Sequence, residues 1–142
     1  MRTTTRLVYI MGRGHSGSTV LDAMLGNAPG VESVGELASA AGRYDDPCSC
    51  GASFARCDFW SAVRARFETD STIGWNEAAL LVKEQAHVGR FVAAALARGS
   101  SLKVCELQAA NQRFRDSIAA VAGTRCVVDS SKEVTRALFL AR

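Results

Sequence analysis

The residues best suited to chemistry are the glycines and hydroxyl side chains of one short segment near the N-terminus. Residues 12 to 19 read Gly-Arg-Gly-His-Ser-Gly-Ser-Thr and follow an apolar run at residues 7 to 11. Glycine lets the backbone approach a ligand closely, and the N–H groups at the start of a helix attract anions. The segment therefore predicts an anion-binding loop between a strand and a helix. A tight turn whose Ser-Gly-Ser residues cap that helix is the simpler alternative.

This loop differs from the phosphate-binding loop of ATP- and GTP-hydrolysing proteins at one position. That loop has the pattern G-x-x-x-x-G-K-[ST], and Ser18 occupies the position of its lysine. Magnesium-dependent phosphoryl transfer relies on that lysine and on a metal, and the sequence shows no evident acidic partner for one. Backbone N–H groups, hydroxyls and one or two cations suffice for a sulfuryl group, which carries less charge during transfer. The loop therefore favours a phosphosulfate donor over ATP.

Composition limits the classes of protein to which the chain can belong. With 142 residues, 48% of them apolar, it is expected to form a single domain or part of one. A net charge of +3 without a run of Lys and Arg does not indicate nucleic-acid binding. No apolar run approaches the roughly 20 residues of a membrane span, and no signal peptide is evident. We therefore expect a cytoplasmic protein, in which five cysteines are not a disulfide framework.

The periodicity of apolar residues predicts the elements that must position the loop. It indicates two buried strands and one shorter strand, and four or five helices, the first with a core-facing stripe of Val20/Met24 and Leu21/Leu25. The expected strands are 7–11, 31–34 and 125–129, and the expected helices are 20–25, 59–67, 77–98, 102–121 and one beginning after residue 132. This order predicts a three-layer α/β fold with a mainly parallel sheet, like that of P-loop NTPases. Residues 42 to 75 form an irregular excursion, and the C-terminus looks truncated.

Three motifs in order give the chain a resemblance to a known family. The segment "GRGHSGSTVLDAMLGNAPGVESVGEL", the C-S-C-G at residues 48 to 51 and the D-S-S-K at residues 129 to 132 resemble PAPS-dependent sulfotransferases of a bacterial type. PAPS is 3′-phosphoadenosine 5′-phosphosulfate. Tyrosylprotein and heparan sulfate sulfotransferases are more distantly similar. The resemblance runs from Leu7 to Lys132 and covers the N-terminal portion of such an enzyme.

The resemblance implies a binding site for the 5′-phosphosulfate in the loop. The residues expected to bind PAPS are Arg13, Gly14, His15, Ser16, Gly17, Ser18 and Thr19. His15 stands where many family members carry Lys or Arg, a cation that stabilises the bridging oxygen as the nucleotide departs. Arg13 is expected to supply the fixed charge that histidine lacks. The alternative for His15 is a partly exposed loop residue without a role.

Two further residues acquire catalytic roles through the resemblance. Glu36 matches the general base that takes the proton of the acceptor hydroxyl, and Lys132 matches a lysine near the sulfuryl group. Asp129, Ser130 and Ser131 are expected to position Lys132 or to contact the acceptor. The alternatives are a helix-capping carboxylate at Glu36, and a helix capped by Ser130 or Ser131 beside a solvated lysine.

The remaining cysteines, tryptophans and His87 have structural interpretations. Cys48, Cys50 and Cys57 have the spacing C-x-C-x6-C, which leaves zinc, a disulfide and reduced structural thiols as alternatives, and zinc would require a fourth ligand. Further along the chain, Cys105 and Cys126 fall on apolar faces and are expected in the core. Trp60 and Trp75 are expected to anchor the excursion, and His87 to lie on the surface or between helices.

The expected activity is transfer of a sulfuryl group from PAPS to a hydroxyl of a small molecule, a glycan or a peptide, without a metal. In the family an Arg and a Ser from an R-D-P-like segment bind the 3′-phosphate, and these 142 residues contain no such segment. The chain alone is therefore expected to bind the nucleotide weakly or to be inactive. A P-loop nucleotide kinase or NTPase with an altered loop, and a non-catalytic anion-binding module, remain the alternatives.

Overall fold

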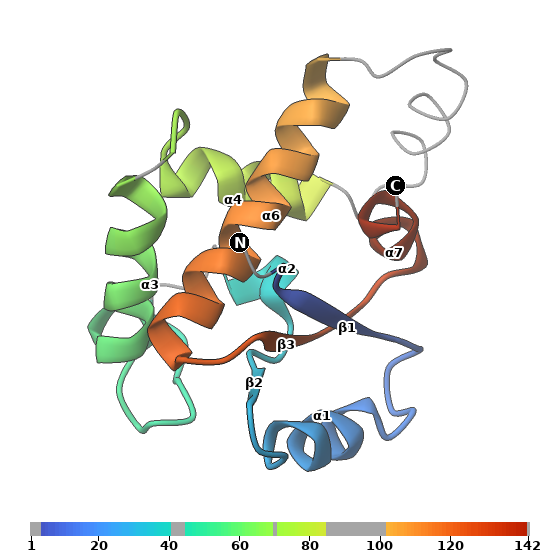
Figure 1. The fold of residues 1–142 in the computed structure, drawn as a ribbon. Helices are drawn as coiled ribbons and strands as arrows, with labels where there is room; N and C mark the ends of the chain where they lie inside the picture. Colours follow the sequence, from blue (N-terminus) through green and yellow to red (C-terminus); the bar gives the residue numbers. More distant parts are fainter. Residues whose placement is uncertain (1–3, 41–44, 70, 85–101, 142) are drawn as a thin grey trace.

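The structure is a computed structural model that describes residues 4–40, 45–69, 71–84 and 102–141 (Figure 1). The described residues contain three strands and several helices. They are β1 (Arg6–Met11), α1 (Ser18–Gly26), β2 (Val31–Ser33), α2 (Leu37–Ala40), η1 (Phe54–Arg56), α3 (Asp58–Thr69), α4 (Trp75–Glu84), α6 (Leu102–Ala122), β3 (Cys126–Lys132) and α7 (Val134–Leu140).

The strands form one parallel sheet in the order β1-β3-β2, which confirms the expected α/β class with a mainly parallel sheet. Tyr9 pairs with Asp129, and Ser33 pairs with Val128. Helix α1 lies on one side of the sheet, and α2, α3 and α6 lie on the other (Figure 1). Because all three strands run in the same direction, their carboxyl ends meet at one edge, where ligands of open α/β sheets bind.

The core lies between the sheet and the helices on the side of α6. Phe67 of α3 stacks on Phe114 of α6 with their ring centroids 4.6 Å apart, and Trp75 meets both rings edge-on. Trp60 is buried and contacts Trp75 at 6.5 Å between centroids. The two tryptophans therefore join the excursion to the domain, as the sequence predicts.

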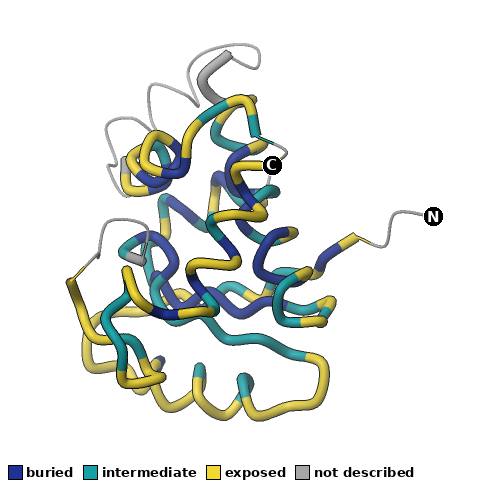
Figure 2. The backbone as a smooth tube through the Cα atoms, turned by 90° about the vertical axis from the view of Figure 1, so that its left-hand side faces the viewer, coloured by how far each residue is buried: buried dark blue, intermediate teal, exposed yellow. Residues whose placement is uncertain are grey.

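The apolar stripe predicted for the first helix does not face the core. Val20 and Met24 are 65% and 68% exposed, and Leu21 is also exposed. Small residues face the sheet instead: Ser18 is buried, and a Cβ on Gly26 would lie only 2.8 Å from Cβ of Ser33 in β2. Helix α1, the lowest segment in Figure 2, is accordingly mostly exposed.

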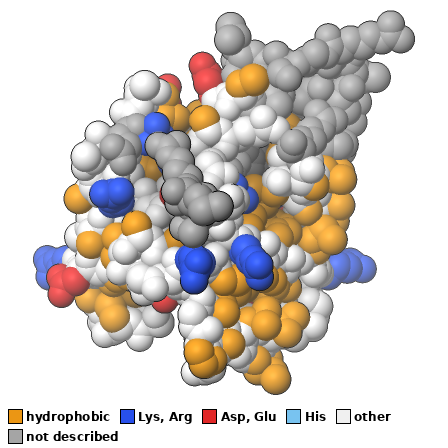
Figure 3. Space-filling model, in the orientation of Figure 1, with side chains coloured by type: hydrophobic (Ala, Val, Ile, Leu, Met, Phe, Trp, Pro, Cys, Tyr) orange, Lys and Arg blue, Asp and Glu red, His pale blue; other side chains and the backbone are white. Residues whose placement is uncertain are grey.

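The first strand is also less buried than predicted. Val8 and Met11 are exposed and only Ile10 is buried, because β1 is an edge strand with β3 as its neighbour in the described sheet. Figure 3 shows hydrophobic side chains gathered at the lower right, where β1 and α1 lie in Figure 1. The strand expected at residues 125 to 129 is, by contrast, the central strand and is buried as predicted.

Of the three longer helices that the sequence predicts, one has different bounds and two are confirmed. The helix expected at 77–98 begins at Trp75, and its residues beyond Glu84, including His87, lie outside the described residues. The helices expected at 59–67 and 102–121 are confirmed as α3 and α6. Gly123 closes α6 with a φ of 66°, and the Thr124 N–H donates to the carbonyl of Ala119 at 3.0 Å.

No described helix combines the length and the apolar character that a membrane crossing requires.

Candidate active site

The loop after β1 is exposed and is joined to the end of β3 by a backbone hydrogen bond. Residues 12 to 17 are all exposed, and the Gly12 N–H donates to the carbonyl of Lys132 at 3.3 Å. A Cβ on Gly12 would lie 2.7 Å from Oγ of Ser16, so only glycine fits there without a shift. The loop thus turns back on itself directly beside the carboxyl end of β3.

The backbone of this loop suits an anion. His15 and Gly17 have φ angles of 63° and 79°, whereas Ser16 between them does not have a positive φ. Alternation of this kind turns successive N–H groups toward one concave side. Within the described chain, the N–H groups of residues 13 to 17 donate to no other backbone group. These donors are therefore exposed and available.

Helix α1 begins at the end of this loop without a side-chain cap. Gly17 is the N-cap, and its carbonyl accepts hydrogen bonds from the N–H groups of Val20 and Leu21. The N-cap is thus the middle residue of the Ser-Gly-Ser segment, and no serine side chain caps the helix. The Ser18 side chain is buried, while Ser16 and Thr19 are exposed at the helix terminus.

Glu36 lies between β2 and the N-terminus of α2. Gly35 makes the turn with a φ of 65°, and two side chains of β3 then cap α2. Asp129 Oδ1 accepts a hydrogen bond from the Leu37 N–H at 3.3 Å, and Ser131 Oγ accepts one from the Ala38 N–H at 2.9 Å. These side chains cap the helix, so the alternative in which the Glu36 carboxylate is the cap is wrong.

Lys132 ends β3 in an unusual backbone conformation. The pairing of β1 with β3 shifts register between Tyr9 and Met11, and Lys132 has a φ of 71°. Irregularities of this kind redirect side chains and often lie beside functional sites. Lys132 Nζ lies 2.5 Å from Oε1 of Glu36, with the two side chains 24% and 38% exposed. The expected pair of catalytic residues is therefore in direct contact.

Asp129 organises this edge of the sheet from inside the protein. Its Oδ2 accepts hydrogen bonds from Nε and Nη2 of Arg136 at 3.2 and 2.8 Å, and both side chains are buried. Ser131 donates to Oδ1 through its N–H at 3.0 Å and through its hydroxyl. Asp129 cannot contact an acceptor from this position. Ser130 and Ser131 belong to β3 and do not cap α7, whose N-cap is Glu133.

A cavity of about 720 Å³ adjoins this edge. Of the predicted residues, Thr19, Glu36 and Ser130 line it, whereas residues 13 to 18 and Lys132 do not. His15 is exposed in the loop and makes no hydrogen bond or ion pair within the described chain. Glu36 therefore contacts Lys132 and shares the cavity with Thr19, whereas His15 does not line the cavity.

Sequence reasoning missed three residues of this region. Asp22 and Glu32 line the cavity, and Arg136 holds Asp129. Asp22 follows Thr19 by three positions, so the helical period could have placed both on one face. No signal in the sequence distinguishes Arg136 from a solvated arginine, because its burial depends on distant elements.

The carboxylates give the cavity wall a negative character. Burial raises the pKa of Glu32 above its ordinary value. Oδ1 of Asp22 is buried and has no hydrogen-bond partner within the described chain. Glu36 and Asp46 also line the cavity, which gives it four carboxyl groups, of which that of Glu36 is paired with Lys132. A polyanionic ligand would be repelled there, whereas hydroxyl and ammonium groups would find acceptors.

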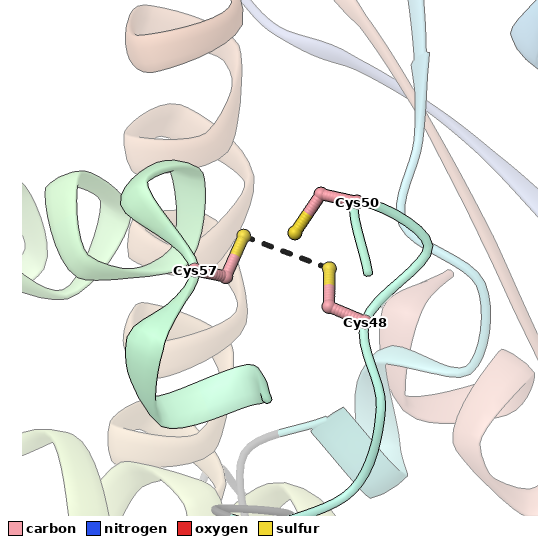
Figure 4. Close-up of side chains that lie close together, drawn as sticks. All are labelled: Cys48, Cys50 and Cys57. Carbon is pink, nitrogen blue, oxygen red and sulfur yellow. Dashed lines mark hydrogen bonds between the residues drawn. The ribbon is translucent and has the colours of Figure 1, made fainter. Parts of the chain in front are cut away.

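Three cysteines complete the cavity wall. Cys48, Cys50 and Cys57 point toward one another, with Sγ of Cys48 3.6 Å from Sγ of Cys57 (Figure 4). All three are free thiols in the structure. Elsewhere Cys126 is partly buried, but Cys105 is exposed on α6, so its expected place in the core is wrong.

Comparison with known proteins finds no match to a family model, to a curated protein or to a solved structure.

Proposed function

We propose that the chain is the donor-binding part of a PAPS-dependent sulfotransferase with a P-loop-like fold. The observation that carries this proposal is the position of an exposed glycine-rich loop, residues 12 to 17, at the same sheet edge as the contacting pair Glu36 and Lys132. Thr19, in the first turn of α1 directly after the loop, lines the cavity together with Glu36.

The proposed reaction uses these groups in turn. Loop N–H groups and Arg13 bind the 5′-phosphosulfate, and the acceptor hydroxyl lies near Glu36. The acceptor oxygen attacks sulfur, the bond from sulfur to the phosphate oxygen breaks, the hydroxyl proton passes to Glu36, and adenosine 3′,5′-bisphosphate leaves. Lys132 is paired with Glu36 in the free protein. Bound phosphosulfate offers its ammonium a second anionic partner, which frees the carboxylate to accept the proton.

The cavity is better suited to the acceptor than to the donor. Asp22, Glu32 and Glu36 would repel the phosphates of the nucleotide, but carboxylates accept hydrogen bonds from hydroxyl groups. The proposal therefore places the nucleotide over the exposed loop and the acceptor in the cavity. It favours neutral or cationic acceptors over anionic ones.

The experiment that tests the proposal separates it from its alternatives. Binding of PAPS and of ATP to the purified chain is measured by calorimetry, with magnesium and with EDTA, and hydrolysis of PAPS to adenosine 3′,5′-bisphosphate is followed by chromatography. Hydrolysis needs no knowledge of the acceptor, because water replaces it. We expect PAPS to bind weakly in EDTA, because these 142 residues contain no R-D-P-like segment for the 3′-phosphate, and to be hydrolysed slowly.

Two results would contradict the proposal. Tighter binding of ATP that depends on magnesium would indicate a nucleotide kinase or an NTPase. Binding of PAPS without any turnover would indicate an anion-binding module if Glu36→Gln and Lys132→Met also left the affinity for PAPS unchanged.

A further inference from the structure

The cluster of Cys48, Cys50 and Cys57 forms a compact arrangement of three sulfur atoms. The three Sγ atoms all lie within 4.8 Å of one another, and those of Cys48 and Cys57 are 3.6 Å apart. Figure 4 shows the three side chains converging from the Cys48–Cys50 turn and from the start of α3. A disulfide bond is only about 2.0 Å long, so none of the pairs is joined in this arrangement.

This spacing matches the sulfur atoms around a tetrahedral metal ion. Zinc–sulfur bonds of about 2.3 Å at tetrahedral angles separate the sulfurs by about 3.8 Å. Thiolates are soft ligands, which favours zinc over magnesium or calcium. We propose that Cys48, Cys50 and Cys57 bind one zinc ion. The fourth ligand is a water molecule or another exogenous donor, because the described residues bring no further Cys, His, Asp or Glu into the group.

The turn that carries two of the ligands is braced by backbone hydrogen bonds. The Cys48 N–H donates to the carbonyl of Ala52 at 2.8 Å, and the Gly51 N–H donates to the carbonyl of Cys48 at 2.9 Å. Gly51 has a φ of 88°, which favours glycine. Pro47 and Ser53 pair across the base of the turn. The two sulfurs are therefore presented by a closed and preorganised turn.

The third ligand sits at the N-terminus of a helix. Cys57 directly precedes α3, and its carbonyl accepts a hydrogen bond from the Ser61 N–H at 2.9 Å. The N–H groups of Trp60 and Phe59 also approach its sulfur. Such donors and the positive end of the helix stabilise a metal-bound thiolate. The site therefore has outer contacts as well as ligands.

The ion would hold together a part of the chain that lines the same cavity as Glu36. It would join the turn at residues 48 to 51 to α3, and all three cysteines line the cavity with Glu36. This role is structural and does not require the metal to take part in sulfuryl transfer. The inference is independent of the proposed function, because the metal site does not depend on what the loop binds.

The test uses the full chain, purified with a phosphine reductant, since an added thiol would occupy the fourth position. Zinc content is measured by mass spectrometry, and cobalt replaces zinc to report the ligands. We expect about one zinc per chain and, with cobalt, the near-ultraviolet thiolate charge-transfer absorption and visible bands of a tetrahedral site. Absence of both signals would overturn the proposal, as would a Cys48–Cys57 disulfide in metal-free protein under these conditions.

Matched serine variants assign the ligands. Cys50 and Cys105 are both exposed, so replacing either by serine is not expected to disturb the core. We expect Cys50→Ser to lose zinc and the cobalt charge-transfer band, and Cys105→Ser to retain both, with the far-ultraviolet circular dichroism of each matching the wild type. Equal retention or equal loss in the two variants would contradict the assignment.

Discussion

Lys132 Nζ and Glu36 Oε1 lie 2.5 Å apart although the two residues are separated by 96 positions in the chain. Each side chain is fixed by its backbone: Glu36 precedes a helix capped from β3, and Lys132 ends β3 at an irregularity in the pairing. The pair is partly exposed at the carboxyl edge of the sheet. An ion pair of this kind contributes about 0–1 kcal/mol to stability, so removing either partner is not expected to unfold the protein.

The first prediction concerns this pair. Glu36→Gln should lower the rate of PAPS hydrolysis by roughly 10²- to 10⁴-fold, because the variant cannot accept a proton. The midpoint of thermal unfolding should change little, because the ion pair is partly exposed. Glu77→Gln, on the exposed surface of α4, is the control. A large loss of stability with an unchanged rate would assign Glu36 a purely structural role.

The second prediction concerns the backbone of the loop. An added Cβ meets no atom within 4 Å at either Gly14 or Gly17, but only Gly17 has a φ in the left-handed region. Gly17→Ala should therefore lower the free energy of unfolding by about 1 kcal/mol and weaken phosphate binding, whereas Gly14→Ala should leave stability nearly unchanged. Denaturant unfolding and calorimetric titration measure the two effects. Equal stability of the two variants would contradict the left-handed N-cap.

The third prediction concerns the buried ion pair of Asp129 with Arg136. Arg136→Met leaves the carboxylate buried without its cation, and should lower the free energy of unfolding by about 3–5 kcal/mol. Because Asp129 also caps α2, the loss should extend to the position of Glu36. Arg125→Met, at an exposed position, is the control. Similar denaturation midpoints for the two variants would show that the pair does not support this edge.

The fourth prediction concerns pH and Glu32. Burial raises the pKa of Glu32 in the folded protein, so the folded state holds this proton to higher pH than the unfolded state does. The stability that the folded state gains by holding this proton is therefore fully present below about pH 4. It is lost as the pH rises through the pKa of Glu32 in the folded protein. Glu32→Gln should be at least as stable as the wild type near neutral pH. Its stability should fall less than that of the wild type between acidic and neutral pH.

Urea unfolding at several pH values measures this difference. Glu68→Gln, on the exposed face of α3, is the control for a carboxyl group near the surface. A stability profile that Glu32→Gln leaves unchanged would contradict the cause assigned to the pKa of Glu32.

Local patterns in the sequence determined which segments form elements and where the loop lies. The apolar runs and the glycines predicted three strands and most helices close to their observed bounds, because strand and helix periods depend on neighbouring residues. The parallel order of the strands also placed Glu36 and Lys132 at one edge, as observed. Their catalytic roles and the binding of PAPS remain predictions.

Only the tertiary structure decided which faces are covered. The stripe at Val20 and Met24 has a helical period suited to a core, yet Ser18 and Gly26 face the sheet because close packing there excludes larger side chains. The burial of Arg136 against Asp129 depends on elements that are distant in the chain. The convergence of the three thiols depends on the path of an irregular turn. The periodicity of apolar residues shows only which helix or strand a segment can form. Which face of that element is buried depends on the other segments that pack against it.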